Sequence, residues 1–177
     1  MSNTTTSSFE TSIGYQALSR IRRNHGLEHA TLHILSKHYP RTSMAGHSNT
    51  TGFWLLGDIP TESVQSGVEE ALNRLRAGEK HLAVHPNCGT NFAVSGTIAG
   101  LAGALALFGA GRSWRDKVER LPLAASLATM GLIVAQPLGL LVQERITTSG
   151  EPGNLEVVEI IPSPRGRIMA HRIITRG

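Results

Sequence analysis

Residues 92–111 have the sequence FAVSGTIAGLAGALALFGAG and residues 121–143 have the sequence LPLAASLATMGLIVAQPLGLLVQ, and these two stretches decide the fold. Neither contains an Asp, Glu, Lys or Arg residue. Each is about 20 residues long, which is the length an α-helix needs to cross the ~30 Å hydrocarbon core of a bilayer. The two stretches therefore predict a transmembrane helical hairpin. The alternative is a pair of buried helices in a soluble protein.

Small residues recur along the first stretch. Gly96 and Gly100 are four residues apart, and Gly103 adds a third small site. Glycines at this spacing let two membrane helices approach closely, because no side chain separates their backbones. We therefore expect a helix contact here, and Gly96 and Gly100 are the candidate positions for contact with a second copy of the chain.

The segment that joins the two stretches is basic. It contains Arg112, Arg115, Lys117 and Arg120, and the positive-inside rule favours a cytoplasmic location for such a loop. The first 90 residues begin without a signal peptide, which argues against their export. The sequence leaves the side of the membrane open, but two crossings place the N- and C-terminal parts on the same side. We expect an integral protein of the bacterial inner membrane, with the lipid bilayer as its partner.

The composition excludes other classes of protein. The formal net charge is +4, yet only 5% of the residues are aromatic and the basic residues are scattered along the chain. A nucleic-acid-binding surface concentrates its positive charge and interleaves aromatic residues, so we expect no nucleic-acid partner. Basic residues near a membrane helix instead suit the anionic lipid surface. Cys88 is the one cysteine, so no intrachain disulfide can form.

The N-terminal part has the pattern of a small α+β structure. Residues 1–9 are polar and predict a disordered tail, and apolar residues at helical spacing predict one long helix over 10–39, with a break at Gly26 as an alternative. Residues 42–59 predict a β-hairpin with its turn near 47–52. A second helix is expected from an N-cap at Thr61 to Gly78, followed by a short strand at 82–85.

The C-terminal part predicts a second β-hairpin. Residues 155–161 and 168–175 are rich in β-branched residues and flank a proline- and glycine-containing turn at 162–166. Because this hairpin lies on the same side of the membrane as the N-terminal part, it can complete one sheet there. The predicted fold is α+β, with a small mixed sheet, two soluble helices and a two-helix transmembrane hairpin. The expected division is a tail at 1–9, a soluble part at 10–90, the transmembrane hairpin at 91–143 and the completing β-hairpin at 144–177.

The sharpest local motif is His25-Gly26-Leu27-Glu28-His29, which has the form H-x-x-E-H. Histidines four residues apart lie on one face of a helix, so His25 and His29 can bind the same metal ion. Glu28 lies beside them and is the candidate general base for a metal-activated water. His33 continues the same face one turn later as an alternative ligand. A purely structural histidine cluster is the competing interpretation.

A second cluster is His85-Pro86-Asn87-Cys88-Gly89-Thr90-Asn91. His85 and Cys88 are separated by two residues, a spacing that metal sites use, and either is a candidate third ligand. Another hypothesis makes Cys88 a nucleophile with His85 or His29 as its base. The structural alternative is a turn that caps the first membrane helix through Thr90 or Asn91.

The motif region resembles the zinc helix of the pitrilysin/insulinase family of inverted-zincin metallopeptidases. The resemblance covers residues 20–78, where Asn24 to Ala30 are followed by Ser48 to Leu56 and a helix that ends near Leu75. It implies that His25 and His29 bind zinc and that Glu28 is the catalytic base. That family takes its third ligand, a glutamate, from a helix further downstream, where this chain begins its apolar hairpin. Taken whole, the chain resembles a bacterial family of uncharacterised two-helix membrane proteins with an early H-x-x-E-H motif.

Two functions from different classes follow. The first is a membrane-anchored zinc-dependent hydrolase, most simply a metallopeptidase, whose peptide or protein substrate lies along the edge of the Phe53 strand. The alternative is a non-catalytic membrane accessory or scaffold protein with a structural metal or none. Glu28 separates the two, because only a catalytic site needs a carboxylate beside the metal.

Overall fold

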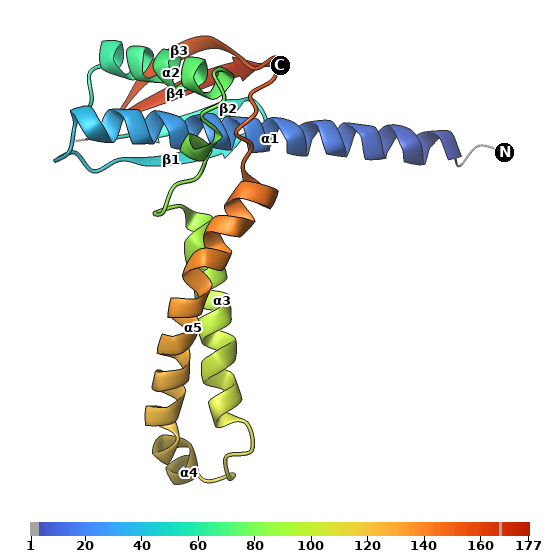
Figure 1. The fold of residues 1–177 in the computed structure, drawn as a ribbon, viewed down its shortest axis with the longest axis vertical. Helices are drawn as coiled ribbons and strands as arrows, with labels where there is room; N and C mark the ends of the chain where they lie inside the picture. The colour runs from blue at the N-terminus through green and yellow to red at the C-terminus, as the bar shows by residue number, and fades with distance from the viewer. Residues whose placement is uncertain (1–3, 167) are drawn as a thin grey trace. The chain divides into compact units, whose positions relative to one another are not determined.

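The computed structural model describes residues 4–166 and 168–177. Within them the chain forms five α-helices and one four-stranded antiparallel sheet, so the predicted α+β class is confirmed (Figure 1). The chain divides into two compact units. One comprises Met1–His85 with Glu144–Gly177, and the other is the hairpin unit Pro86–Gln143.

The longest element is helix α1, Thr4–His38. It begins inside the segment 1–9 that was predicted as a tail, whose first three residues lie outside the described ones. The helix continues unbroken through Gly26, so a break there is wrong. Gly26 instead admits the backbone of Ser149, whose carbonyl a Cβ at this position would overlap. Ser149 N also donates a hydrogen bond to Arg22 O at 2.9 Å, which fixes this close approach.

The sheet has the strand order β1-β2-β4-β3, formed by β1 Ala45–Asn49, β2 Gly52–Leu56, β3 Glu156–Arg165 and β4 Ile168–Arg176. Every pair is antiparallel, so the prediction of a mixed sheet is wrong. The reason is that β4 adds to β2 in the opposite direction, as far as Ala170 beside Leu56. The Phe53 strand, β2, is paired on both sides, so its edge is not open to a peptide as predicted. The outer strands are β1 and β3.

Helix α2, Thr61–Arg76, covers the sheet together with α1. Its buried face, which includes Val64 and Val68, packs into one core with Leu35 of α1 and Phe53 and Ile173 of the sheet. Burial of such side chains contributes about 1.5–3 kcal/mol each, which is why this face and not propensity fixes the helix. Pro60, rather than Thr61, is the N-cap residue.

The segment after α2 departs from the prediction. A strand was expected at 82–85, but Lys80–Ala83 form a 3-10 helix, η1. The physical reason is that the carbonyl groups here bond to side chains instead of to a neighbouring strand. Ala83 O and Val84 O accept hydrogen bonds from the rings of His29 and His33.

The hairpin unit contains α3 Gly89–Leu107, the short α4 Trp114–Glu119 and α5 Leu121–Val142, which passes into a π-helical turn, Gln143–Thr147. A Cβ on Gly131 of α5 would lie 3.1 Å from Ala99 Cα, so this glycine permits the helix contact. Gly103 also faces α5, whereas a Cβ on Gly96 or Gly100 would meet nothing within 4 Å.

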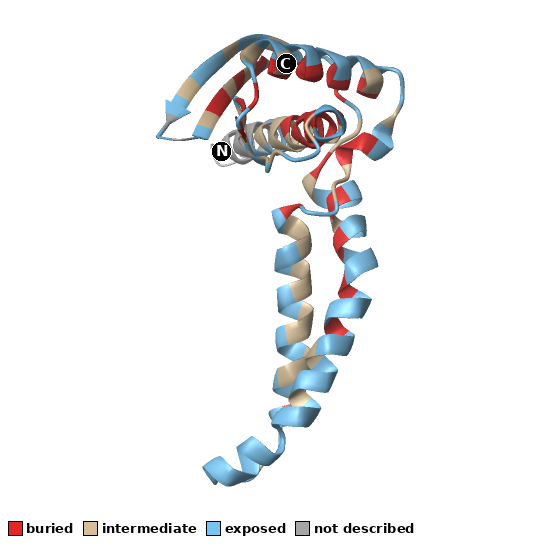
Figure 2. Cartoon of the chain, turned by 90° about the vertical axis from the view of Figure 1, so that its left-hand side faces the viewer, coloured by how far each residue is buried: buried red, intermediate tan, exposed pale blue. Residues whose placement is uncertain are grey.

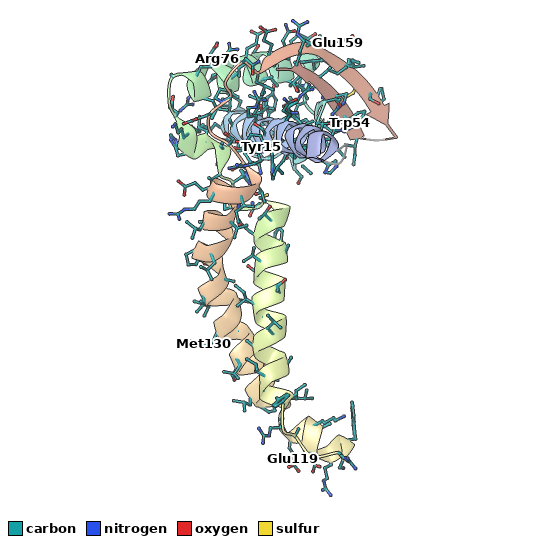
Figure 3. The ribbon with its side chains drawn as sticks, turned by 90° about the vertical axis from the view of Figure 1, so that its right-hand side faces the viewer. Tyr15, Trp54, Arg76, Glu119, Met130 and Glu159 are labelled. Atoms are coloured by element: carbon teal, nitrogen blue, oxygen red, sulfur yellow. The ribbon has the colours of Figure 1, made fainter. Side chains whose placement is uncertain are left out.

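Two helices of the chain are long and apolar enough to cross a membrane. The most apolar 18-residue stretch of each helix has a mean hydropathy of 1.4 in Gly89–Leu107 and 1.8 in Leu121–Thr147. Only 6% and 17% of the residues in these two stretches are buried. Figure 2 shows them largely in the exposed colour, and Figure 3 shows the side chain of Met130 on the outside of α5. A core helix of a soluble protein would instead be mostly buried.

Candidate metal centre

Helix α1 presents a row of histidines at four-residue spacing. The ring centroids of His25 and His29 are 4.3 Å apart, because residues one turn apart lie one above the other. His85, which follows η1, brings its ring 5.8 Å from that of His29 and 4.7 Å from that of His33. The fold thus brings His85 beside His29 and His33, while His25 neighbours His29.

Hydrogen bonds fix the tautomers of the three α1 rings. Nδ1 of His25 bonds to Thr147 O at 3.0 Å, Nδ1 of His29 to Ala83 O at 2.8 Å, and Nε2 of His33 to Val84 O at 2.8 Å. A carbonyl oxygen only accepts hydrogen bonds, so in each case the ring nitrogen is the donor. The second nitrogen of each neutral ring then carries a lone pair. Metal-binding histidines are oriented by this kind of outer hydrogen bond.

The ring separations also suit a shared metal ion. Two imidazoles bound to one tetrahedral zinc at about 2.1 Å place their ring centroids about 5 Å apart. The measured separations of 4.3, 4.7 and 5.8 Å lie on both sides of this value. The His25–His29 pair, at 4.3 Å, is therefore within about one ångström of the separation that a shared metal ion requires.

His85 has an unusually low basicity. Burial lowers its pKa to about 4, and the neighbouring rings of His33 and His29 add to the shift because a second positive charge there is repelled. His85 is therefore neutral at pH 7. A neutral imidazole is the form that binds a metal ion.

Glu28 lies under strand β1. It is 4% exposed, and its Oε2 accepts a hydrogen bond from Ser48 Oγ. Gly46, two residues earlier on β1, leaves room for the carboxylate, which a Cβ would overlap. Burial raises the pKa of the Glu28 carboxyl above its usual value, while the Ser48 hydrogen bond and the nearby rings of His25 and His47 act in the opposite direction.

Cys88 belongs to the hairpin unit, where it is the N-cap residue of α3. Its Sγ accepts a hydrogen bond from Thr90 N at 3.4 Å, so the cap is made by Cys88 rather than by Thr90 or Asn91 as predicted. Cys88 follows His85 by three residues. Because an extended chain spans at most ~3.6 Å per residue, the Cα atoms of His85 and Cys88 lie within about 11 Å of each other in any conformation. His25, His29 and Cys88 are of the kinds that could hold a metal ion.

Several contributors to the site carried no local sequence signal. Gly46 and Ser48 act on Glu28 from a strand, and the carbonyl groups of Ala83, Val84 and Thr147 orient the histidines from distant segments. Backbone acceptors have no residue-type signature. The alternation of Gly46 and Ser48 on one strand face is the one pattern that could have indicated a small, polar cover for a buried carboxylate.

Comparison with known proteins identifies the family of the chain. A family model described as a domain of unknown function, DUF6391, matches residues 20–160. The chain belongs to this family. An uncharacterised protein of the cyanobacterium Picosynechococcus sp. is 35% identical over 160 residues, covering 83% of this chain and 74% of that protein. No solved structure matches.

The span matched to DUF6391 includes all five predicted site residues and both apolar helices. The sequence predicted that the chain belongs to a family of uncharacterised proteins, and the match to DUF6391 shows membership of such a family. Neither comparison links the chain to a peptidase family.

Proposed function

We propose that this chain is a membrane-anchored, zinc-dependent hydrolase that acts on peptides. The main observation behind the proposal is the arrangement of His25 and His29. They lie one turn apart with each ring held by a carbonyl hydrogen bond, and Glu28 lies next to them in the sequence. This set of side chains matches the needs of a hydrolytic zinc site, namely two oriented imidazoles and one carboxylate.

The donor set favours zinc among the common metals. Imidazole nitrogen and thiolate sulfur are borderline-to-soft ligands, whereas magnesium and calcium prefer oxygen. His85 and Cys88 remain the two candidates for the third ligand. They are only three residues apart in the sequence, so a site that one of them can reach is also near the other. When bound, the metal would polarise a carbonyl group and lower the pKa of a coordinated water.

Glu28 is the proposed general base. A base works best when its pKa lies near the working pH, and burial moves the pKa of Glu28 in that direction. In this role the Glu28 carboxylate takes a proton from the attacking water and returns it to the leaving amine. Glu28→Gln keeps the shape of the side chain and removes this capacity.

The peptide class is supported by strand β1. This strand is an outer strand of the sheet, and its residues Gly46 and Ser48 contact Glu28. An extended peptide that adds to such an edge is held by main-chain hydrogen bonds. A peptide on β1 would therefore lie on the strand that covers the proposed base, which replaces the earlier assignment to the Phe53 strand.

The membrane anchor is the hairpin unit. Its two helices have the length and hydropathy of membrane spans, and the basic residues of the connecting segment around α4 suit an anionic lipid surface. The remaining parts of the chain would lie together on one side of a bacterial inner membrane. Gly96 and Gly100, which face away from α5, are the positions proposed to contact a second copy.

The number of metal ions per chain in the purified protein tests the proposal. We expect about one zinc per chain in the detergent-purified wild type and in Glu28→Gln, and loss of that zinc in His29→Ala. His38→Ala is the matched control, because His38 is an exposed histidine of the same helix and should leave the zinc in place. A wild type without metal after chelator-free purification would rule out the hydrolase.

The alternative is a non-catalytic accessory or scaffold protein with a structural metal or none. The Ser48 hydrogen bond favours it, because this contact already gives Glu28 a role in tying α1 to β1. Peptide hydrolysis by the zinc-loaded wild type that is lost in Glu28→Gln would exclude the alternative. Bound zinc with no hydrolysis in either protein would support it.

A further inference from the structure

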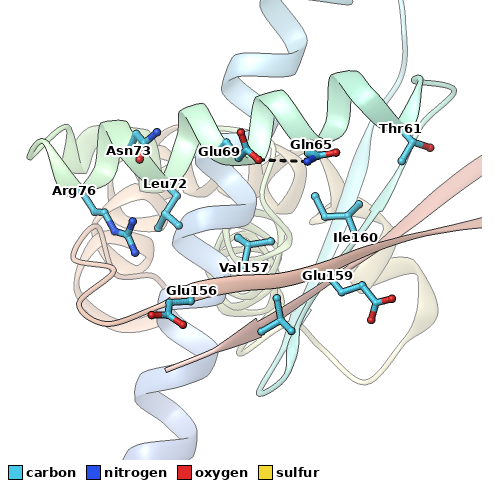
Figure 4. A pocket seen from close by; sticks show the side chains of 11 residues that line it. Thr61, Gln65, Glu69, Leu72, Asn73, Arg76, Glu156, Val157, Glu159 and Ile160 are labelled. Carbon is cyan, nitrogen blue, oxygen red and sulfur yellow. Dashed lines mark hydrogen bonds between the residues drawn. The ribbon is translucent and has the colours of Figure 1, made fainter.

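A groove separates helix α2 from the outer strand β3. Its volume is about 670 Å³, and Figure 4 shows the side chains that line it. One face of α2 contributes Gln65, Glu69, Leu72 and Arg76, and β3 contributes all of residues 156–160. Successive residues of a strand point to opposite faces. Five consecutive residues line the groove because the register of β3 against β4 shifts between Val157 and Glu159, which breaks the alternation there. The groove lies beside β3, which is an outer strand of the sheet.

This edge is available for pairing. In the part of the chain that the structure describes, β3 pairs with β4 alone. Alternate N–H and C=O groups of an outer strand therefore point away from its sheet and can accept another strand. Pro162 and Pro164 lie in the second half of β3, where they remove donors and hinder pairing. Residues 156–161, beside the groove, contain no proline.

The lining combines an apolar floor with negative charge. Val157 and Ile160 are partly buried against the core, and Leu72 of α2 is 7% exposed. Three carboxylates, Glu69, Glu156 and Glu159, line the groove with one guanidinium, that of Arg76.

The existing contacts leave this charge unbalanced. Arg76 donates a hydrogen bond to Leu155 O at 2.9 Å, and Glu156 pairs with Arg176 at 3.0 Å. Among the described residues, neither Glu69 nor Glu159 forms an ion pair. Cationic side chains are therefore the complement that the groove lacks.

We infer that the groove binds an extended peptide segment rich in lysine or arginine, which adds to the edge of β3 as a fifth strand. The five lining residues of β3 match a segment of about five residues, since an extended chain advances ~3.3 Å per residue. Apolar side chains of the segment contact the apolar floor, and its lysine or arginine side chains pair with the carboxylates. The groove shares no residue with the candidate metal centre, so the inference does not rest on the proposed function.

The test uses a fluorescent synthetic peptide, Lys-Val-Lys-Val-Lys, and the full-length detergent-purified protein in the presence of a chelator. We expect saturable binding that weakens as salt is added. The same peptide with an N-methyl group on every backbone amide keeps its charge but has no N–H donor to pair as a strand at either edge, so its binding should be lost. The peptide Glu-Val-Glu-Val-Glu should not bind. Equal binding of the N-methylated peptide, or no saturable binding at millimolar concentration, would overturn the inference.

Variants locate the binding site. Glu69→Gln combined with Glu159→Gln should weaken binding of the lysine peptide by at least about fivefold, because two exposed ion pairs are removed. Both residues are exposed, so the fold should be retained. Glu119→Gln combined with Glu144→Gln is the matched control and should bind as the wild type does. Equal affinities for the two double variants would contradict binding in this groove.

Discussion

At the scale of residues, Gly46 and Glu28 are closely packed at the candidate site. The two lie on different elements, β1 and α1, and the carboxylate occupies the volume that a Cβ of residue 46 would need. The backbone of Gly46 is not in the left-handed region, so its role is to leave space and not to relieve strain. The buried carboxylate depends on this space, because its charge is stabilised only where Ser48 can reach it.

Gly46→Ala should therefore lower stability by about 1–3 kcal/mol, the usual cost of overpacking a buried site. Thermal unfolding of the metal-free protein measures the change. In a double-mutant cycle, Glu28→Ala vacates the space that the new methyl group needs, so the combined variant should lose less stability than the sum of the single changes. Additive losses would show that the two residues do not compete for one volume.

His171 is a second residue whose environment has a measurable consequence. It is fully buried in β4, as its position in a predicted strand suggested, and it shares a 3.1 Å hydrogen bond with Thr61 Oγ1. Among the described residues its Nδ1 finds no hydrogen-bond partner, so protonation of this ring is not compensated there. Burial accordingly lowers the pKa of His171 below its usual 6.5.

This pKa shift predicts a loss of stability in acid. Above pH 6.5 the ring is neutral in both states, and as the pH falls below that value the unfolded chain takes up the proton more readily, so folding weakens. His171→Leu should reduce the fall in melting temperature between pH 7 and pH 5, at a cost of about 1 kcal/mol for the lost hydrogen bond. The exposed-site control His81→Leu should keep the wild-type fall. An unchanged pH dependence in His171→Leu would contradict the assignment.

At the scale of elements, glycine residues determine how closely helices α3 and α5 of the hairpin pack. The contact between α3 and α5 passes through Gly131 and Gly103, while Gly96 and Gly100 lie off this contact. Near the base of the hairpin, Gln143 Nε2 donates a hydrogen bond to Asn91 Oδ1 at 2.5 Å. Close helix approach and an interhelical hydrogen bond are the interactions that hold membrane helices together, because lipid provides no hydrophobic force between them.

Gly131→Ile and Gly96→Ile should therefore differ. At Gly131 the new side chain meets Ala99 Cα and must separate the helices, which we expect to lower the melting temperature in detergent. At Gly96 it enters open space, so the single-chain stability should remain unchanged. A shift of the Gly96 variant from dimer to monomer would in addition support the proposed contact with a second copy. Equal melting temperatures for both variants would place the helix contact elsewhere.

The two apolar helices impose a topology on the molecule as a whole. If both cross the bilayer, the N- and C-terminal segments that build the sheet must be on the same side, since β2 pairs with β4 across the hairpin insertion. The short connecting helix α4, capped by Ser113 and Asp116, would be on the opposite side.

Accessibility of introduced cysteines measures this topology. In intact bacterial cells a membrane-impermeant thiol reagent should label only one of Ser66→Cys and Lys117→Cys, and the other should react only after the membrane is opened. Both positions are exposed, so the contrast does not depend on local folding. Labelling of both variants in intact cells would exclude a spanning hairpin, and it would favour apolar helices that pack against a protein.

The sequence predicted the elements whose signals are local. The helix and strand patterns gave the α+β class, both β-hairpins and the two apolar helices. It failed where a distant segment decides the outcome. The strand predicted at 82–85 does not form, because the rings of His29 and His33 bond to the carbonyl groups of Ala83 and Val84, and the sheet is wholly antiparallel because β4 joins β2.

The sequence alone determined the spacing of His25, Glu28 and His29 and the apolar length of the two hairpin helices, because helical periodicity and bilayer thickness act on consecutive residues. The tertiary structure alone decided that His85 joins the row of His25, His29 and His33, that β1 rather than β2 offers an edge beside Glu28, and that β3 borders a groove. These depend on packing between different elements, such as Ser48 against Glu28, 20 residues apart, and Ala83 against His29, 54 residues apart, for which no local pattern exists.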